Sequence, residues 1–211
     1  MESCEYGWPV RIDHVIYATH DLTSAIRHFD EQYGLTASRG GVHPQLGTCN
    51  SLVAVGRRQY IELMAVADPA ADSLLVRSLT KVLADGDRLF ALSIEPEDLE
   101  ETAARLNLQI TEGERRSNGG RLVRWRMAGL GEAAGPQRLP FFVDWGDSDP
   151  DLDESHNGDV DGVAWVELGG DERTARRWLG ESGTLPLRFA GGPPGPLAVG
   201  LRRGPETVVI R

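Results

Sequence analysis

Several residue types are scarce in this sequence, and each scarcity narrows what the protein can be. The 211 residues include two cysteines, Cys4 and Cys49, without a CxxC or other metal-ligand spacing, so no disulfide framework is predicted. Lys81 is the single lysine among 22 basic residues, and 32 acidic residues bring the net charge to −10. So acidic a chain lacks the basic face that nucleic acid requires, and we expect no nucleic-acid partner.

Long apolar runs are also missing. No segment approaches the roughly 18 continuous apolar residues of a membrane span, so we expect no membrane partner. Residues 1–10 lack the basic and apolar regions of a signal peptide, which favours a cytoplasmic location. Arginine in place of lysine, with abundant alanine, glycine and leucine, is typical of a high-GC bacterial genome. At 40% hydrophobic and 26% charged residues, the chain can still bury a substantial core.

The N-terminal part of the sequence predicts a strand, a helix and three further strands. Residues 11–19 are rich in isoleucine and valine, as strands are. Asp21 is placed to cap the following helix, and Gly34 suits the position just past its end. The stretches LTASRG, TCNSLVAV and RQYIELMAV read as strands, with VGRRQ as the tight turn between the last two. The predicted order is therefore βαβββ.

This order of elements recurs along the chain. RLFALSIEPEDLEETAARLNLQITEG, followed by RLVRWRMAGL and LPFFVDWGD, repeats it, and a third copy starts at Val160, where VDGV lies over IDHV. Each unit has one sheet face that it cannot bury alone, so units must pair in what we predict to be an α+β fold. A short helix is expected at Leu74–Leu83. The predicted units are 10–66, 89–147 and 160–211, and the linkers are 67–88 and the acidic 148–159.

Three motifs resemble the glyoxalase-like branch of the vicinal oxygen chelate superfamily. HPQLGTCN at residues 43–50 matches an H-P-x-x-G-T-x-N element, YIEL at residues 60–63 matches Y-x-E-L, and PFFVDWG at residues 140–146 matches P-F-[FL]-[VI]-[DE]-W-G. The resemblance covers roughly residues 10–211. It implies paired βαβββ units that form a cupped mixed β-sheet. It does not fix the chemistry, because the superfamily includes isomerases, lyases, epimerases, extradiol dioxygenases, thiol transferases and drug-sequestering proteins.

The cofactor that the resemblance implies is one divalent metal ion, held in the cup by the first and last strands of two paired units. Carried over residue by residue, His14 and Glu62 are the metal ligands of the first unit and Asp144 is the ligand of the second. The set is incomplete, because Ala91 and Gly162 stand where the second or third unit would supply a first-strand ligand. Alternatively, His14 is hydrogen-bonded at the rim of a pocket, Glu62 is paired with an arginine and Asp144 caps the turn that follows it.

The same motifs supply candidate catalytic and substrate-binding residues. Glu62 and His43 are the catalytic candidates. His43 lies in a Gly-rich loop, where it could complete the metal shell, act as a general base or hydrogen-bond a ligand. The alternative roles are strand-edge hydrogen bonding for Thr48 and Asn50, and core packing for Tyr60, Phe142 and Trp145. The substrate-binding candidates are His43, Thr48, Asn50, Tyr60, Phe142 and Trp145.

Two functions of different classes fit these residues. In the first, the cup is a metal-dependent isomerase, lyase or dioxygenase that binds neighbouring oxygens of a small molecule. In the second, it is a metal-free module that sequesters a hydrophobic small molecule or antibiotic, with His43 and Asn50 setting the orientation. The broken ligand set motivates the second. Whether the first unit pairs with the second or the third stays open, and the remaining unit either covers the cup or pairs with another copy in a homodimer.

Overall fold

A computed structural model describes residues 10–116, 120–148, 150, 152, 157–180 and 185–211. Cys4 and part of the predicted linker at 148–159 lie outside the described residues. The helices are α1 (Leu22–Tyr33), α2 (Leu74–Leu83), α3 (Leu99–Leu106), α4 (Leu130–Ala134) and α5 (Glu172–Leu179). The strands are β1 (Arg11–Ala18), β2 (Ser38–His43), β3 (Thr48–Gly56), β4 (Gln59–Val66), β5 (Arg88–Glu95), β6 (Ile110–Arg116), β7 (Leu122–Ala128), β8 (Phe141–Asp144), β9 (Val163–Gly169), β10 (Leu187–Phe189), β11 (Gly195–Arg203) and β12 (Glu206–Ile210).

Local signals determine where the helices begin and end. The side chain of Asp21 accepts a hydrogen bond from the backbone N–H of Ser24 at 2.7 Å, which caps α1. Gly34 has φ 61°, the left-handed conformation that lets the chain turn away after the helix. Asp98 and Asp171 cap α3 and α5 in the same way as Asp21. In the described part of the chain, no helix is long and apolar enough to cross a membrane.

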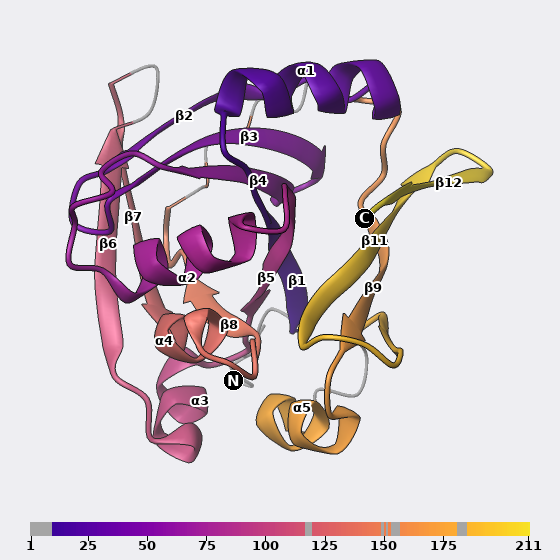
Figure 1. Ribbon diagram of the computed structural model, residues 1–211. Coiled ribbons are helices and arrows are strands. Elements are labelled where there is room, and N and C mark those ends of the chain that lie inside the picture. Colours follow the sequence, from indigo (N-terminus) through magenta and orange to yellow (C-terminus); the bar gives the residue numbers. More distant parts are fainter. Residues whose placement is uncertain (1–9, 117–119, 149, 151, 153–156, 181–184) are drawn as a thin grey trace, which may run out of the picture.

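The first two units pair into one eight-stranded sheet with the order β2-β3-β4-β1-β5-β8-β7-β6. β1 and β5 lie antiparallel at its centre, so the second unit is the partner of the first. The sheet is strongly curved (Figure 1), and α2 and α4 pack against residues on its concave side, which include Ile16, Met64 and Phe141. This arrangement confirms the predicted cupped mixed sheet of the vicinal oxygen chelate fold.

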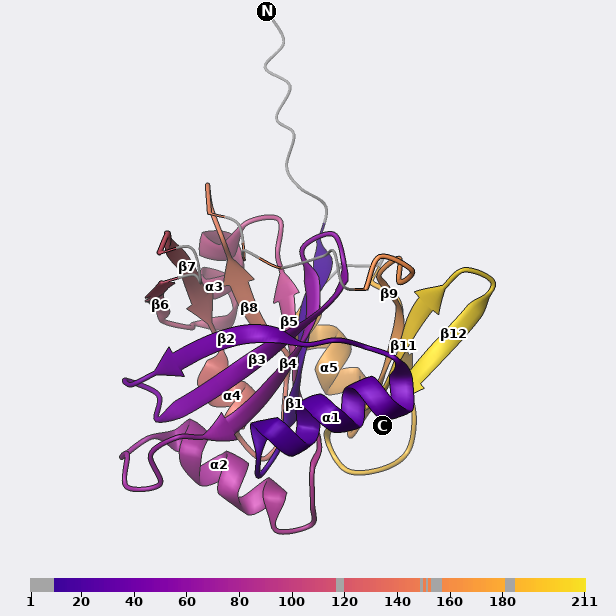
Figure 2. The ribbon, with the colours of Figure 1, turned by 90° about the horizontal axis from the view of Figure 1, so that it is seen from above.

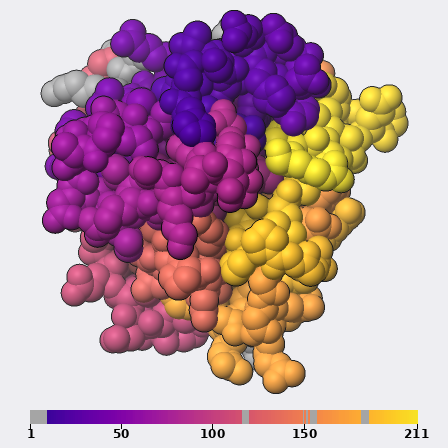
Figure 3. Space-filling view, in the orientation of Figure 1, coloured from indigo at the N-terminus to yellow at the C-terminus, as the bar shows by residue number. Residues whose placement is uncertain are grey.

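The C-terminal stretch forms a separate four-stranded sheet with the order β10-β9-β11-β12. Its elements follow the order βαβββ along the chain, but its strands are arranged differently from those of the first unit. The first strand of this unit, β9, pairs with the second and third strands, β10 and β11. The first strand of the first unit, β1, instead pairs with the fourth strand of that unit, β4. Figure 2 shows β9, β11 and β12 beside the strands of the first unit. In the space-filling view, the yellow C-terminal residues lie directly against the indigo N-terminal residues (Figure 3).

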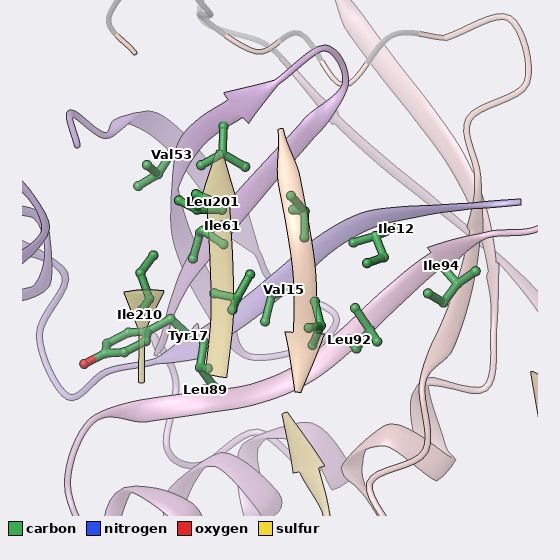
Figure 4. Packing of buried hydrophobic residues seen from close by; sticks show 14 of the residues in the cluster. Ile12, Val15, Tyr17, Val53, Ile61, Leu89, Leu92, Ile94, Leu201 and Ile210 are labelled. Atoms are coloured by element: carbon green, nitrogen blue, oxygen red, sulfur yellow. The ribbon is translucent and has the colours of Figure 1, made fainter. Parts of the chain in front are cut away.

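The two sheets share one apolar core, which lies on the convex side of the curved sheet. Val15 and Leu92 of the large sheet pack in one cluster with Leu201 and Ile210 of the small sheet (Figure 4). Because neighbouring strand residues face opposite sides, residues beside Val15 face the cup. The C-terminal sheet therefore covers the outer face and leaves the cup to the first two units.

Candidate ligand-binding and catalytic site

A β-bulge in β1 brings two consecutive polar side chains together. The register between β1 and β5 shifts between Ile12 and His14, which leaves Asp13 as the extra residue. If the side chains of β1 alternated strictly between the two faces of the sheet, the Asp13 carboxylate would point into the apolar core on the convex side, where an unpaired charge is very unfavourable. In the bulge, Asp13 Oδ1 instead lies 2.5 Å from His14 Nδ1.

His14 is the centre of a buried chain of polar contacts. Its Nε2 lies 3.4 Å from Oε2 of Glu62, which faces the cup from β4. Glu62 Oε1 accepts a 2.5 Å hydrogen bond from Asn50 Nδ2, and Asp13 Oδ2 accepts one of 2.8 Å from Trp145 Nε1. The exposed fractions are 0% for Asp13, 4% for His14 and 6% for Glu62, so water screens these charges very little.

The contacts determine the charge of each group at neutral pH. Burial alone would lower the pKa of His14, but the hydrogen bonds and charges of Asp13 and Glu62 raise it to about 9. Burial works to raise the pKa of Glu62, but hydrogen bonds from His14 and Asn50 and the positive charge of His14 hold it below its usual value. The pair is therefore an imidazolium beside a carboxylate.

Two aromatic rings hold the His14 ring in place. The Tyr60 ring stacks on it with the centroids 4.5 Å apart, and Phe141 meets it edge-on at 5.4 Å. A cation over an aromatic face is attracted by the ring's electron density, so the stacked tyrosine favours the protonated imidazole. Burial and the charges of Asp13 and Glu62 raise the pKa of Tyr60 well above its usual value, so the phenol stays neutral.

A hollow that we call the inner pocket opens above these residues, with an empty volume of about 630 Å³ that includes its open mouth. Apolar and aromatic side chains make up most of its lining, and a small set of polar groups converges on it, as in typical small-molecule sites. The polar lining residues are His14, His43, Asn50, Glu62 and Arg115. The apolar and aromatic ones are Ile16, Leu46, Leu52, Tyr60, Met64, Leu75, Trp125, Met127, Leu130, Phe141, Val143 and Trp145.

A second hollow, the outer chamber, adjoins the inner pocket. Its empty volume of about 1410 Å³ also includes open solvent. The two hollows share five lining residues, so one ligand could occupy both. The shared residues are His43, Leu46, Trp125, Met127 and Leu130. The charged side chains in the described lining of the outer chamber are all acidic: Glu112, Glu114 and Glu132.

Most of the predicted site residues lie together. His14, His43, Asn50, Tyr60, Glu62 and Trp145 all line the inner pocket. Thr48 is fully buried behind them, and its Oγ1 lies 3.1 Å from His43 Nδ1, so it positions the imidazole. Burial lowers the pKa of His43, with Glu62 opposing the effect and Arg115 adding to it, so His43 is neutral where His14 is charged.

Asp144 and Phe142 do not line the pocket, and the structure corrects their predicted placement. Along β8, Phe141 and Val143 face the cup. Phe142 therefore faces the other side, where its ring lies 6.2 Å from that of Trp178 on α5. Asp144 also points away from the cup and forms an ion pair with an arginine on β7, Arg126.

The strand register explains why the expected metal ligands are incomplete. The repeat aligns His14 with Ala91. The residue that corresponds to Glu62 is Phe141 rather than Asp144. Glu62 lies opposite Ile16, two positions after His14, and Phe141 lies opposite Ser93, two positions after Ala91. Alanine and phenylalanine therefore occupy the positions that would complete a four-ligand shell. Among the described residues, no group of three His, Cys, Asp or Glu side chains could hold a metal ion, so the residues present do not fit the divalent ion that the resemblance implied.

The site residues that the sequence analysis missed include Asp13, Arg115 and Trp125. The first had a detectable signal, because two adjacent polar residues interrupt an otherwise apolar strand, and only a bulge keeps both out of the core. Arg115 and Trp125 lie on β6 and β7, where charged residues alternate along β7 but are adjacent at the end of β6. Nothing local distinguishes the side chains on those strands that face the cup.

Comparisons with known proteins identify the family. Residues 12–182 match the family described as a glyoxalase-like domain, and the chain belongs to that family. A hypothetical protein from Staphylococcus aureus shares the fold, with a TM-score of 0.60, 15% identity and coverage of 95% of this chain and 84% of that one.

Two methylmalonyl-CoA epimerases are also similar to part of the chain. The enzyme from Streptomyces coelicolor, in complex with 2-nitronate-propionyl-CoA, has a TM-score of 0.47 and 19% identity, and covers 66% of this chain and 96% of its own. The enzyme from Mycobacterium tuberculosis has a TM-score of 0.44 and 21% identity, with 63% and 84% coverage. The comparison with curated proteins finds no match.

Proposed function

We propose that the cup binds a small molecule with an apolar body and a carbonyl group, and that His14 and Glu62 move a proton on it without a metal ion. The observation that carries the proposal is the charged pair of His14 and Glu62 in a pocket with a largely apolar lining. Perturbed titratable groups that face such a pocket are typical of catalytic sites.

The chemistry follows from competition for the His14 proton. A carbonyl oxygen that enters the pocket competes with Glu62 for the hydrogen bond from His14 Nε2. As the ligand takes that bond, Glu62 loses a contact that lowers its pKa and becomes a stronger base. Glu62 then accepts a proton from the carbon beside the carbonyl, while the imidazolium stabilises the negative charge on oxygen. Return of the proton to the same or a neighbouring carbon gives epimerisation or isomerisation.

The supporting residues keep this pair in position before the ligand arrives. Asp13 orients the imidazole through Nδ1 and favours its charged form. Asn50 holds the Glu62 carboxylate, and Asn50 Oδ1 in turn accepts a 2.7 Å hydrogen bond from the backbone N–H of Gly41. Groups fixed in this way need no rearrangement when charge develops on the substrate.

The outer chamber restricts the charge of the part of the ligand that lies outside the inner pocket. Its acidic lining repels phosphate groups, such as those of a coenzyme A ester. We therefore expect the part of the ligand in the outer chamber to be neutral or cationic.

Deuterium uptake tests the proposed reaction. EDTA-treated protein would be incubated in D₂O with a panel of small aliphatic and aryl ketones, and mass spectrometry would measure exchange at carbon. We expect the wild-type protein to exchange at least one of them and Glu62→Gln to be slower by roughly 10²–10⁴-fold. Asp144→Asn makes the same chemical change outside the pocket and should exchange normally. Exchange that requires added Mn²⁺ or Zn²⁺ would contradict the proposal.

Binding without catalysis is the second candidate function. The lowered pKa of Glu62 favours it, because a carboxylate so well stabilised is a weak base. Trp125 and Trp145 line the pocket, so tryptophan fluorescence would report ligand binding directly. Quenching by a ketone that is equal in wild type and Glu62→Gln, without deuterium uptake in either, would assign the cup to binding alone.

A further inference from the structure

A third hollow lies where the two sheets meet, and none of its described lining residues belongs to the inner pocket or outer chamber. Its empty volume is about 1080 Å³, open solvent included. Basic side chains outnumber acidic side chains in its lining by four to two, although the whole chain has 22 basic and 32 acidic residues. The charged lining residues of this basic hollow are Lys81, Arg88, Arg138 and Arg211, with Asp85 and Asp87.

Arg138, in the segment between α4 and β8, is held in the wall of the basic hollow by an unusual local structure. Its φ is 44°, in the left-handed region that residues other than glycine rarely adopt. Its guanidinium carbon lies 4.7 Å from the centre of the Phe90 ring. Gly195 leaves room for the side chain, since a Cβ at that position would lie 2.9 Å from Arg138 Cδ. The surroundings must enforce such a backbone conformation, which strains a residue with a side chain.

Within the part of the chain that the structure describes, the guanidinium of Arg138 has no counter-charge. In the described ranges it forms no ion pair, and its buried Nη1 has no hydrogen-bond partner. Burial lowers the pKa of Arg138, and the positive charge of Arg88 lowers it further, which shows that the two cations repel each other. A buried donor without an acceptor is unfavourable, and a bound ion is one way to satisfy it.

The carboxylates of the basic hollow do not supply the missing acceptor. Asp87 is held by the Thr19 hydroxyl at 2.5 Å and by the backbone N–H of His20 at 3.0 Å. Asp85 lies 3.8 Å from Arg88 Nη1, and the buried Nε of Arg88 has no partner among the described residues. Among the described residues, Arg88 and Arg138 therefore each have a buried N–H group without an acceptor.

We propose that the basic hollow binds an oxyanion, a phosphate or a carboxylate group, between Arg88 and Arg138. The planar guanidinium fork matches both groups and forms charge-assisted hydrogen bonds with them. The lining includes Pro193 and Leu197 from the loop and strand of the C-terminal sheet, while Arg88 begins β5 of the large sheet. A bound oxyanion thus links the two sheets and stabilises the folded chain.

Thermal unfolding with added anions tests the proposal. The wild-type protein would be titrated with inorganic phosphate or with acetate, with NaCl used to keep the ionic strength constant. We expect the melting temperature to rise with anion concentration. In Arg138→Met and Arg88→Met, the apparent affinity should fall about tenfold or more, since each removes charge-assisted hydrogen bonds. A response to phosphate alone assigns a phosphate site, and a response to both anions assigns a site for carboxylates as well.

Arg188→Met is the matched control. Arg188 also lies over an aromatic ring, 4.1 Å from the centre of Trp165, but outside the basic hollow, so its loss should leave the anion response unchanged. Equal responses in Arg188→Met and the two test variants, or no response in the wild type, would overturn the proposal. If Arg138→Met does not fold, Arg88→Met and Arg138→Lys decide the question, since lysine keeps the charge without the fork. A phosphate response unchanged from wild type in both Arg88→Met and Arg138→Lys would also overturn the proposal.

Discussion

Replacing Asp13 with asparagine tests the buried chain of charges directly. The change keeps the size of the side chain and removes the charge that contacts His14 Nδ1. In the wild type, the pKa of His14 is raised from 6.5 to about 9, which corresponds to about 3 kcal/mol of stability. Because the folded-state pKa lies above the unfolded value, this stability is complete below about pH 6.5 and is lost as the pH rises through about 9.

Without the Asp13 charge, burial remains the largest influence on the pKa of His14, and of the two carboxylates only Glu62 is left to oppose it. The pKa of His14 should therefore fall, and the protonated form should be lost at a lower pH. Removing one member of a buried charged cluster destabilises a protein by roughly 3–5 kcal/mol. We expect Asp13→Asn to lose about 3 kcal/mol at pH 7 and to vary less in stability between about pH 7 and 10 than the wild type.

Urea unfolding, followed by tryptophan fluorescence from about pH 6 to 10, would measure the free energy of unfolding. NMR of the imidazole nitrogens would measure the pKa of His14 itself. Asp144→Asn is the control, because it makes the same change at a partly exposed carboxylate that pairs with Arg126. A wild-type His14 that titrates near 6.5, or an Asp13→Asn stability curve parallel to that of the wild type, would refute this reasoning.

Two further predictions concern packing around the site. In Gly40→Ala, the new Cβ would lie 2.0 Å from Asn50 Oδ1, so we expect the free energy of unfolding in urea to fall by about 1–3 kcal/mol. Gly41→Ala is the control, because a Cβ at that position has nothing within 4 Å. Equal stability of the two variants would contradict the structure. Trp178→Phe removes the 2.7 Å hydrogen bond from Nε1 to the Pro140 carbonyl and should lose about 1 kcal/mol without changing ligand quenching in the inner pocket. Altered quenching would show that this contact supports the cup.

Much of the architecture could be predicted from the sequence, because the signals that determine it are local. Stretches rich in isoleucine and valine, the Asp21 cap and Gly34 sufficed to identify the elements of the first unit. The family resemblance also predicted that His14 and Glu62 face one shared hollow, and both line the inner pocket. The order of strands in the C-terminal sheet was not, because it depends on which backbone edges meet in three dimensions.

The sequence by itself determined most of the elements and, through its family motifs, the cupped sheet and one facing pair of ionisable residues. Only the tertiary structure decided that Asp13 joins His14, that Phe141 and not Asp144 faces them, and that the second unit closes the cup. The physical reason is that a shift of one residue in strand register turns every following side chain to the other face. Register and bulges result from contacts between strands far apart in the chain, which no local pattern records.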